Sequence, residues 1–301
     1  MEGAGLKNFL KNFYIKARRC FFCLLTCISP ELNNKIRYLE IFKKPLPIDD
    51  PVTFQEKLLW LKLKNYNNNP LVIKCADKYA VREYVRSCGY EDILNELTGV
   101  FDSPDEIDWD SLPQQFVLKW NFGAGMNIVC SEKSKLDKEE TVKKLKKWGK
   151  RKYWLSHGEM HYKFIPKKII CEKYLSDSIN KVIPDYKVYC FNGKPLAVLV
   201  MEGRGSKISA QFFDKDWNKL KNSEKYEPAS NNVEKPVCLK EMIEAAEKLS
   251  APFPFVRCDF YIVNGKLYFG ELTFTPAGGF YPAQTEINGR SMGEYIVIKL
   301  K

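Results

Sequence analysis

Two carboxylates occupy positions of a predicted β-hairpin where apolar residues would be expected. The stretch 255–279 predicts two strands joined at Asn264-Gly265, the dipeptide most typical of a two-residue hairpin turn. Pairing across this turn brings Asp259 of the first strand close to Glu271 of the second. Such carboxylates repel each other unless a cation lies between them, and Mg²⁺ bound by one or two carboxylates and nucleotide phosphates satisfies this requirement. The hairpin alone is equally compatible with two solvent-facing acids that each pair with a lysine or arginine.

Glycines mark two places where a ligand can approach the backbone closely. The hairpin ends in Thr-Pro-Ala-Gly-Gly at 275–279, a rigid turn into a glycine pair. Upstream, a predicted strand at 115–119 is followed by Trp-Asn-Phe-Gly-Ala-Gly at 120–125 and by a second strand at 126–130. This order predicts a flap whose backbone N–H groups bind phosphates. It is not a P-loop, because no helix follows and GK[ST] is absent. Lys119, at the end of the first strand, is placed to reach the same phosphates.

Lys78 is a further candidate for phosphate contact. Residues 71–75 predict a short strand or turn, and Asp77 predicts the cap of a helix that ends at Gly89. Lys78 would then lie in the first turn of that helix, where a cation is unfavourable to the helix dipole. A functional role explains this placement, and a solvated lysine explains it equally well.

The composition of the chain favours anionic partners. It has 301 residues, 45% of them hydrophobic, and a formal net charge of +11, as in a globular protein that binds nucleic acid, phosphorylated substrates or an acidic membrane surface. The positive charge is spread along the chain and no recognition motif for nucleic acid is present, so we expect no nucleic-acid partner. The ten cysteines lack the spacing of a disulfide framework, which indicates a reducing, cytoplasmic location.

The N-terminal residues 6–28 predict an amphipathic, basic helix. The apolar run from Cys20 to Ile28 is far shorter than the roughly 20 residues that a membrane-spanning helix needs. We expect a helix that packs on the rest of the protein; the alternative is a peripheral contact with the inner face of the membrane or with a partner. Cys20, Cys23 and Cys27 share one face of this helix, but without a fourth ligand nearby they do not favour a metal site.

Two further patterns come close to known motifs without matching them. His157 and His161 enclose HGEMH, which differs from the zinc motif HExxH because the glutamate is displaced by one place and Gly158 weakens a helix. We therefore expect no zinc site. The lysine-rich helix predicted at 137–152 indicates a solvated face, with contact to an anionic membrane or polymer as the alternative.

The remaining segments complete an α+β chain. After a helix capped by Thr53, the sequence predicts a buried strand at 167–175, a hairpin at 184–200 turned at Asn192-Gly193, a strand at 209–213 and an amphipathic helix at 239–249. We expect four regions: a helical N-terminal extension (1–70), an N-terminal α/β lobe (71–114), a flap subdomain (115–175) and a C-terminal subdomain with the metal site (176–301).

Six segments occur together in an order that is specific to one protein family. They are TFQEKLLWLKL, ADKYAVREYV, FVLKWNFGAGMNIVC, KKIICEKYL, PDYKVYCFNGKP and DFYIVNGKLYFGELTFTPAGG, within roughly residues 35–290. Together they resemble the ATP-grasp superfamily, and within it the TupA-like branch of polysaccharide biosynthesis. The resemblance implies an ATP-grasp fold of the α+β class, in which a small flap subdomain and a larger antiparallel-sheet subdomain hold the nucleotide between them, with a helical N-terminal extension.

The resemblance also implies roles for individual residues, with ATP and Mg²⁺ as cofactors. Residues that it places at ATP are Lys78 and Lys119 at the phosphates, Gly123 and Gly125 in the loop, Glu172, Lys173 and Leu175 along the adenine, and Asp185. Residues that it places at Mg²⁺ are Asp259, Glu271 and Thr273; those with catalytic roles are Arg257, at the acyl phosphate, and Lys187. The chain departs from the family at Thr273, where many relatives have asparagine, and at Phe122 and Ala124, where they have histidine and serine.

The function that this resemblance implies is an ATP-dependent carboxylate–amine ligase. Such an enzyme forms an amide through an acyl phosphate, here between a sugar acid of a capsule, O-antigen or cell-wall polysaccharide and an amino acid or amino alcohol. One alternative is a kinase on the same fold that stops at phosphate transfer. The other is a non-catalytic protein that binds an anionic polysaccharide and has a decayed nucleotide site.

Overall fold

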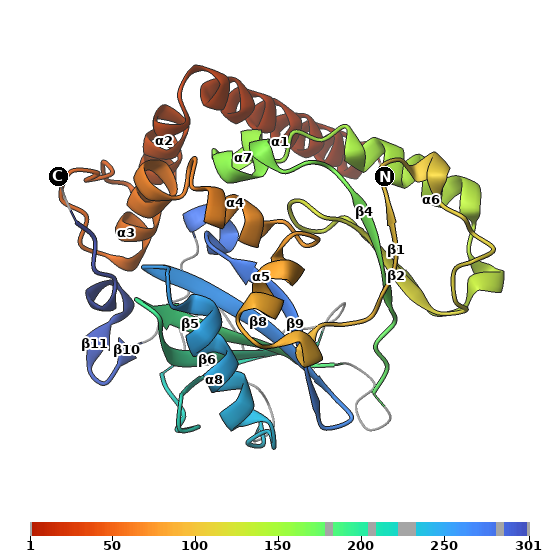
Figure 1. The fold of residues 1–301 in the computed structure, drawn as a ribbon. Helices are drawn as coiled ribbons and strands as arrows, with labels where there is room; N and C mark the ends of the chain where they lie inside the picture. Colours follow the sequence, from red (N-terminus) through yellow and green to blue (C-terminus); the bar gives the residue numbers. More distant parts are fainter. Residues whose placement is uncertain (1, 178–182, 204–208, 222–232, 281–285, 300–301) are drawn as a thin grey trace.

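Two antiparallel sheets form the centre of the computed structural model, which describes residues 2–177, 183–203, 209–221, 233–280 and 286–299 (Figure 1). The smaller sheet has the order β1-β4-β2-β3, with β1 (Leu97–Phe101), β2 (Phe116–Trp120), β3 (Asn127–Cys130) and β4 (Ile169–Lys173). The larger has the order β7-β6-β5-β8-β9, with β5 (Asp185–Phe191), β6 (Lys194–Glu202), β7 (Ser209–Asp214), β8 (Phe255–Val263) and β9 (Lys266–Thr273). A short ribbon of β10 (Glu286–Ile287) and β11 (Arg290–Ser291) follows.

Helices surround these sheets, and with them they confirm the predicted α+β class. They are α1 (Glu2–Ile28), α2 (Pro30–Phe42), α3 (Phe54–Trp60), α4 (Pro70–Ala76), α5 (Val81–Ser87), α6 (Lys138–Gly149), α7 (Trp154–His157) and α8 (Leu239–Ser250). The predicted cap of α3 is present: the Thr53 hydroxyl accepts the Glu56 N–H, and the Glu56 carboxylate accepts the Thr53 N–H.

The segment around Lys78 differs from the prediction. Residues 71–75 belong to a helix, not to a strand or turn, because the Asn69 side chain caps it and Pro70 occupies its first position. The Asn-Pro pair therefore begins a helix where the sequence predicts a short strand or turn. The next helix, α5, starts later than predicted, since the Asp77 carboxylate accepts the N–H of a residue two places on and holds a tight turn. Lys78 thus precedes the helix, and no helix-dipole argument applies to it.

Both hairpins of the larger sheet turn where the sequence predicts. The central residues have positive φ angles: 49° at Asn192, 76° at Gly193, 49° at Asn264 and 75° at Gly265. These values are those of a type I′ turn, whose twist matches that of the flanking strands.

One irregularity sets the pairing of β8 with β9. Phe260 pairs with Phe269, whereas the residue before Phe260 in β8, Asp259, pairs with Glu271. Gly270, between Phe269 and Glu271, is therefore an additional residue in β9. A Cβ at Gly270 would lie 2.9 Å from the backbone oxygen of Asp259, so only glycine fits. The predicted proximity of the two carboxylates is confirmed, and the bulge makes them direct neighbours.

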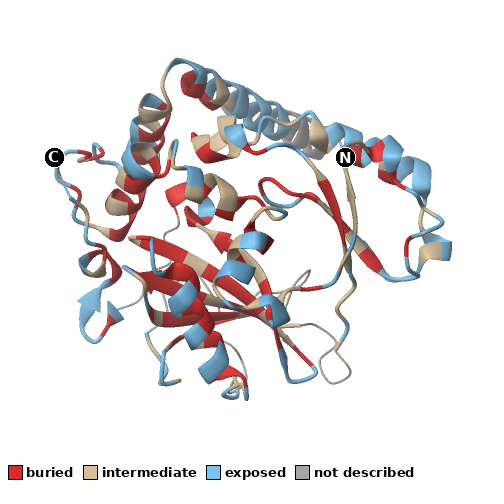
Figure 2. Cartoon of the chain, viewed as in Figure 1, coloured by how far each residue is buried: buried red, intermediate tan, exposed pale blue. Residues whose placement is uncertain are grey.

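The larger sheet has an apolar face and a polar face. α8 covers the apolar face with Met242, Ala246 and Leu249, and Figure 2 shows buried residues concentrated in the sheet and on the inner side of this helix. Because side chains alternate along a strand, Cys258 of β8 faces α8 while its neighbour Asp259 faces the other way.

The N-terminal helix packs on the protein, as expected. α1 runs alongside α2 and α7 (Figure 1), and its Thr26 hydroxyl donates to the backbone oxygen of Leu155 at 2.7 Å. From α2, Arg37 donates to the backbone oxygen of Ser156 at 2.8 Å. These bonds fasten α7, which is a single turn long, to the two N-terminal helices. Within the described residues, no helix has the length and hydropathy needed to cross a membrane.

Candidate active site

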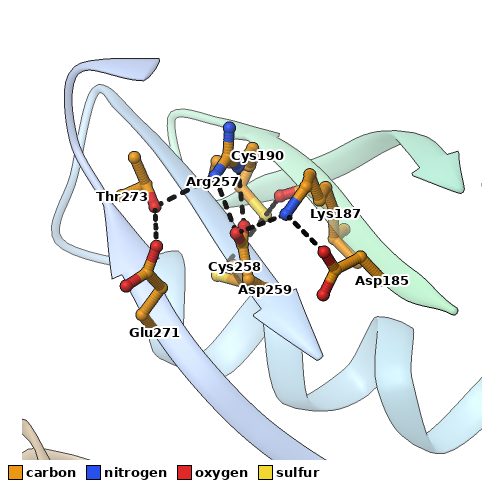
Figure 3. A network of polar contacts seen from close by, with 9 residues as sticks. Asp185, Lys187, Cys190, Arg257, Cys258, Asp259, Glu271 and Thr273 are labelled. Atoms are coloured by element: carbon orange, nitrogen blue, oxygen red, sulfur yellow. Dashed lines mark hydrogen bonds and ion pairs between the residues drawn. The ribbon is translucent and has the colours of Figure 1, made fainter. Parts of the chain in front are cut away.

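The charged residues of the predicted site share one face of three neighbouring strands (Figure 3). The register places Asp259 of β8 opposite Glu271 of β9 on one side and opposite Lys187 of β5 on the other. Arg257 of β8 lies opposite Thr273 of β9 in the same way. Figure 3 shows these side chains pointing toward one another across the strands, so the structure brings together all the residues predicted for metal binding and catalysis.

Asp259 is the centre of this row. Arg257 donates to both of its carboxylate oxygens, at 2.6 and 2.7 Å, and Lys187 donates to one of them at 2.9 Å. Lys187 also lies 3.6 Å from the carboxylate of Asp185. Burial alone would raise the pKa of Asp259, but the charges and hydrogen bonds of Arg257 and Lys187 outweigh it and hold the pKa below its usual value. Asp259 is therefore a buried anion at neutral pH.

Glu271 connects the row to the flap. It accepts a hydrogen bond from the Thr273 hydroxyl at 3.2 Å, and its carboxylate lies 3.4 Å from the Lys78 ammonium. Lys78 donates at the same time to the backbone oxygen of Gly123 in the glycine loop. Lys78 thus contacts both the predicted metal ligand Glu271 and the predicted phosphate-binding loop.

The donor set of this row fits Mg²⁺ that is bound together with a nucleotide. Asp259, Glu271 and Thr273 offer two carboxylates and a hydroxyl, which are the hard oxygen ligands that Mg²⁺ prefers. Among the described residues no cluster of three or more histidines, cysteines or acids forms a complete metal site. The remaining ligands would therefore be water and phosphate, as is usual for Mg²⁺ at nucleotide sites.

The glycine loop between β2 and β3 is anchored at its base. The buried Asn121 donates to the Asp77 carboxylate at 2.8 Å, and its backbone oxygen accepts the N–H of Lys78 at 2.9 Å. Gly123 and Gly125 have φ angles of 66° and 71°, which favour glycine. The turn that carries Lys78 and the loop that carries the two glycines are therefore one hydrogen-bonded unit.

Lys119 and Glu172 form a second charged cluster, on the smaller sheet. Their side chains are 2.7 Å apart across β2 and β4, and Arg82 lies 3.8 Å from the same carboxylate. All three side chains are largely buried. Glu172 thus holds Lys119 beside the start of the segment predicted to lie along the adenine.

Lys173 and Leu175 belong to that adenine segment, at and beyond the end of β4. The N–H of Lys173 donates to the backbone oxygen of Glu96 at 3.0 Å, and its carbonyl accepts from the side chain of Asn95 at 2.8 Å. The Lys173 ammonium is exposed and lies 3.2 Å from the Glu96 carboxylate. Because both backbone groups of Lys173 have partners, we expect an adenine edge to bind chiefly to the residues that follow it.

A cavity of about 310 Å³ lies beside the charged row. Its lining comes from four places: the glycine loop, the segment of α7, strands β8 and β9, and the turn at 275–278. The lining residues are Gly123, Ala124, Tyr153, His157, Glu159, Tyr162, Arg257, Glu271, Thr273, Thr275, Pro276, Ala277 and Gly278.

Titratable groups in the wall of this cavity have perturbed pKa values. Burial raises the pKa of Glu159, although the charge of Lys62 and a hydrogen bond from Thr275 oppose the shift. Burial, together with the charges of Arg37 and Lys62, lowers the pKa of His157 to about 3. At neutral pH the imidazole of His157 is therefore uncharged.

The α7 side of this cavity was not predicted from the sequence. Tyr153, Glu159 and Tyr162 carry no motif, and the HGEMH segment was considered only as a zinc site. They line the cavity because α7 is hydrogen-bonded to α1 and α2, which lie far from it in the chain, and packs beside the turn at 275–278. The one sequence signal was a glutamate next to histidines and tyrosines in a segment without helical periodicity.

A glycine flap opposite a charged, antiparallel sheet is the architecture of the ATP-grasp class. A family model described as TupA-like ATPgrasp matches residues 56–297, well over half of the chain, and the chain belongs to this family. The match confirms the predicted family. No curated protein matches the chain by sequence.

Several solved structures resemble this one in fold. The D-alanine–D-alanine ligase from Bacillus anthracis is 19% identical, with a TM-score of 0.40 over 67% of this chain and 57% of that one. An ADP complex of purK, N5-carboxyaminoimidazole ribonucleotide synthetase, is 14% identical, with a TM-score of 0.44 over 73% and 50%. The L-amino acid ligase from Bacillus licheniformis is 15% identical, with a TM-score of 0.43 over 72% and 47%. The match thus spans about half the length of these proteins.

Proposed function

We propose that this protein is an ATP-dependent carboxylate–amine ligase that uses Mg²⁺. The observation that carries the proposal is the charged row: Asp259 lies directly opposite Glu271, and Arg257 and Lys187 contact Asp259 from the same face. Lys78, in the turn that is hydrogen-bonded to the glycine loop, lies 3.4 Å from Glu271 of the row. Groups suited to phosphate and groups suited to Mg²⁺ are thus adjacent, which is what phosphoryl transfer requires, because its catalysis depends on positioning and charge neutralisation.

The residues of the site have separate roles in phosphoryl transfer. Lys78, Lys119 and the backbone N–H groups of the glycine loop bind the phosphates. Bound Mg²⁺ supplies further positive charge at the phosphates, with Asp259, Glu271 and Thr273 as its protein ligands. Arg257 stabilises the acyl phosphate, because its planar guanidinium can donate two parallel hydrogen bonds to an anion. Lys187, which donates to Asp259 at 2.9 Å, would supply a further positive charge to the acyl phosphate.

The proposed substrates are a sugar acid of a capsule, O-antigen or cell-wall polysaccharide and an amino acid or amino alcohol. The support for a polyanionic substrate is the net charge of +11, which attracts acidic polymers. The family resemblance supports the reaction, in which ATP phosphorylates the carboxylate and the amine displaces phosphate. We place the reaction in the cytoplasm, because all ten cysteines are free thiols.

The decisive assay mixes ATP, Mg²⁺, a uronic acid or its glycoside and a panel of amines, and measures phosphate together with product mass. A ligase gives ADP, phosphate and an amide. A kinase gives ADP and a stable phosphorylated product without any amine, and a non-catalytic binding protein gives neither. If the wild type and Glu271→Gln cannot be distinguished, the protein is not an enzyme of this kind.

We also propose a peripheral contact between α1 and an anionic membrane. One side of α1 carries five exposed apolar or aromatic side chains: Leu10, Tyr14, Phe21, Leu24 and Ile28. Successive members are three, four or seven residues apart, and the buried Phe22 and Leu25 lie on a different side of the helix. Residues 7–28 include five lysines and arginines and no acid. An exposed apolar stripe on a basic helix is the arrangement of helices that lie in the surface of an anionic membrane.

A further inference from the structure

The cavity beside the charged row has two walls of different character. One wall carries Arg257, Glu271 and Thr273, which belong to the proposed phosphoryl-transfer site. The other wall carries the buried carboxylate of Glu159 and the rings of Tyr153 and neighbouring residues of the α7 segment. A molecule in this cavity would touch the place where an acyl phosphate forms and would also contact the carboxyl group of Glu159.

Glu159 lacks a full counter-charge. The Thr275 hydroxyl donates to one of its oxygens at 2.6 Å, while the other lies 3.9 Å from Nδ1 of the uncharged His157. The side chain is only 5% exposed, and within the described residues it forms no ion pair with a lysine or arginine. A buried carboxylate without a paired cation is costly, so this site favours a ligand that brings a positive charge.

The buried Lys62 forms its hydrogen bonds with backbone oxygens and not with Glu159. Lys62 donates to the backbone oxygens of His157 and Gly278, and its ammonium lies 4.8 Å from the centre of the Phe280 ring. Lys62 thus ties the α7 segment to the turn at 275–278. Its charge favours the ionised form of Glu159 from a distance, but its hydrogen bonds go to the backbone.

We infer that this cavity is the binding site for the amine substrate and that Glu159 binds the ammonium group. The inference rests on the proposed ligase function. The volume of about 310 Å³ lies at the small end of ligand sites, which suits an amino acid or amino alcohol and is too small for a polymer. Tyr153 and Tyr162 also line the cavity, with ring centres 5.1 Å apart in an edge-to-face arrangement, and aromatic rings attract cations.

The chemistry of amide formation requires such a group. The amine nitrogen attacks the carbonyl carbon of the acyl phosphate, the C–N bond forms, and the C–O bond breaks with its electron pair leaving on phosphate. The nitrogen loses two protons between ammonium and amide. One protonates the departing phosphate, and the other passes to Glu159 and from there to solvent. Binding the ammonium at Glu159 also holds the amine in the same cavity as Arg257 and the acyl phosphate, which favours attack on the carbonyl carbon.

The test compares two nucleophiles that differ in charge. Hydroxylamine is mostly uncharged at neutral pH and traps an acyl phosphate as a hydroxamate, whereas an amino acid or amino alcohol enters as an ammonium. In Glu159→Gln, we expect KM for the best amine of a panel of amino acids and ethanolamine to rise at least tenfold, with hydroxamate formation within twofold of the wild type. Glu159→Asp should recover part of the loss, and Glu247→Gln, on the exposed side of α8, serves as the matched control.

The outcomes separate this inference from the proposed function. No hydroxamate from the wild type would overturn the ligase proposal itself. Hydroxamate formation by the wild type together with an unchanged amine KM in Glu159→Gln, or with no amine accepted at all, would overturn the assignment of the cavity. An equal loss with both nucleophiles would show that Glu159 is only structural. Should Glu159→Gln not fold, Thr275→Val removes the positioning hydroxyl, and the same selective rise in amine KM is expected.

Discussion

Asp259 and Glu271 face each other across two strands, but the structure gives them different surroundings. Asp259 is buried and neutralises Arg257, whereas the Glu271 side chain is 38% exposed. We expect Asp259→Asn and Glu271→Gln each to lower kcat by about two decades or more, which is typical of the loss of a main electrostatic stabiliser. Only Asp259→Asn should also destabilise the fold, by about 3 kcal/mol, because it leaves a buried arginine without its counter-charge.

Denaturant unfolding and ATP turnover on the same two variants measure both effects. Glu271→Gln should change the unfolding free energy by no more than about 0.5 kcal/mol, as is common for a partly exposed side chain. Equal destabilisation by both substitutions would contradict the structural difference between the two carboxylates.

A substitution of Arg257 tests its proposed contact with the acyl phosphate. Arg257→Lys keeps the positive charge but loses the planar fork that donates to both oxygens of Asp259. We expect kcat to fall while the affinity for ATP, measured by calorimetry, stays nearly unchanged. A matching loss of ATP affinity would assign Arg257 to the nucleotide instead.

His161 makes stability depend on pH. It is fully buried, neither ring nitrogen has a hydrogen-bond partner, and burial lowers its pKa to about 3. The unfolded chain binds a proton there near pH 6.5, whereas the folded chain does not, so stability is lost as the pH falls from about 6.5 toward 3. His161→Leu should therefore be more stable than the wild type, and its advantage should grow between pH 7.5 and pH 5. Thermal unfolding at the two pH values checks this, and an advantage that stays constant would contradict it.

At the scale of elements, the glycine loop offers a matched pair of substitutions. Gly123 and Gly125 both have positive φ, so alanine costs about 1–2 kcal/mol of backbone strain at either. A Cβ at Gly123 would also lie 2.6 Å from the Tyr153 ring, whereas one at Gly125 meets no atom within 4 Å. Gly123→Ala should therefore displace the loop and raise KM for ATP more than Gly125→Ala does. Similar kinetics for the two would show that Tyr153 does not fix the loop.

The stripe on α1 is testable without removing the helix. Deleting residues 1–28 would also remove the support of α7, so Tyr14→Glu together with Leu24→Glu is the better change, because these two side chains of the stripe are 63% and 64% exposed. We expect the double variant to lose binding to phosphatidylglycerol vesicles and to keep its thermal stability. Val237→Glu, which alters an isolated exposed residue, is the control. Unchanged vesicle binding by the double variant would reject the membrane contact.

Local signals made some elements predictable and left others out of reach. The hairpin of β8 and β9 could be predicted because Asn264-Gly265 fixes its turn, and the Thr53 cap because it lies within four residues. The helix α4 was missed, since an Asn-Pro pair can end one helix or begin another and only packing decides. The Glu159 side of the cavity was missed because it depends on α1 and α2 holding α7, a contact between residues more than a hundred positions apart.

At the scale of the whole molecule, one apolar core passes through both sheets, from Phe116 and Leu118 of the flap to Phe260 of the larger sheet. A ligand that bridges the sheets should therefore stabilise the protein as a unit. ATP with Mg²⁺ should raise the melting temperature, and saturation to 100 times Kd corresponds to about 2.7 kcal/mol. Lys78→Met should reduce the shift at a given ATP concentration. No shift at millimolar ATP would favour the decayed-site alternative.

The bulge at Gly270 has a consequence for how the chain can change in length. On its turn side, Phe269 and Phe260 share the face that packs on the core; on its far side, Glu271 and Asp259 share the opposite face. Adding or removing one residue in each strand between Gly270 and the turn would lengthen or shorten only the turn end of the hairpin. Asp259 and Glu271 would still pair and would still face the same side of the sheet. A single insertion beyond Gly270 would exchange inside for outside along the rest of β9. Length variation in descendants of this chain should therefore be confined to the turn side of one glycine.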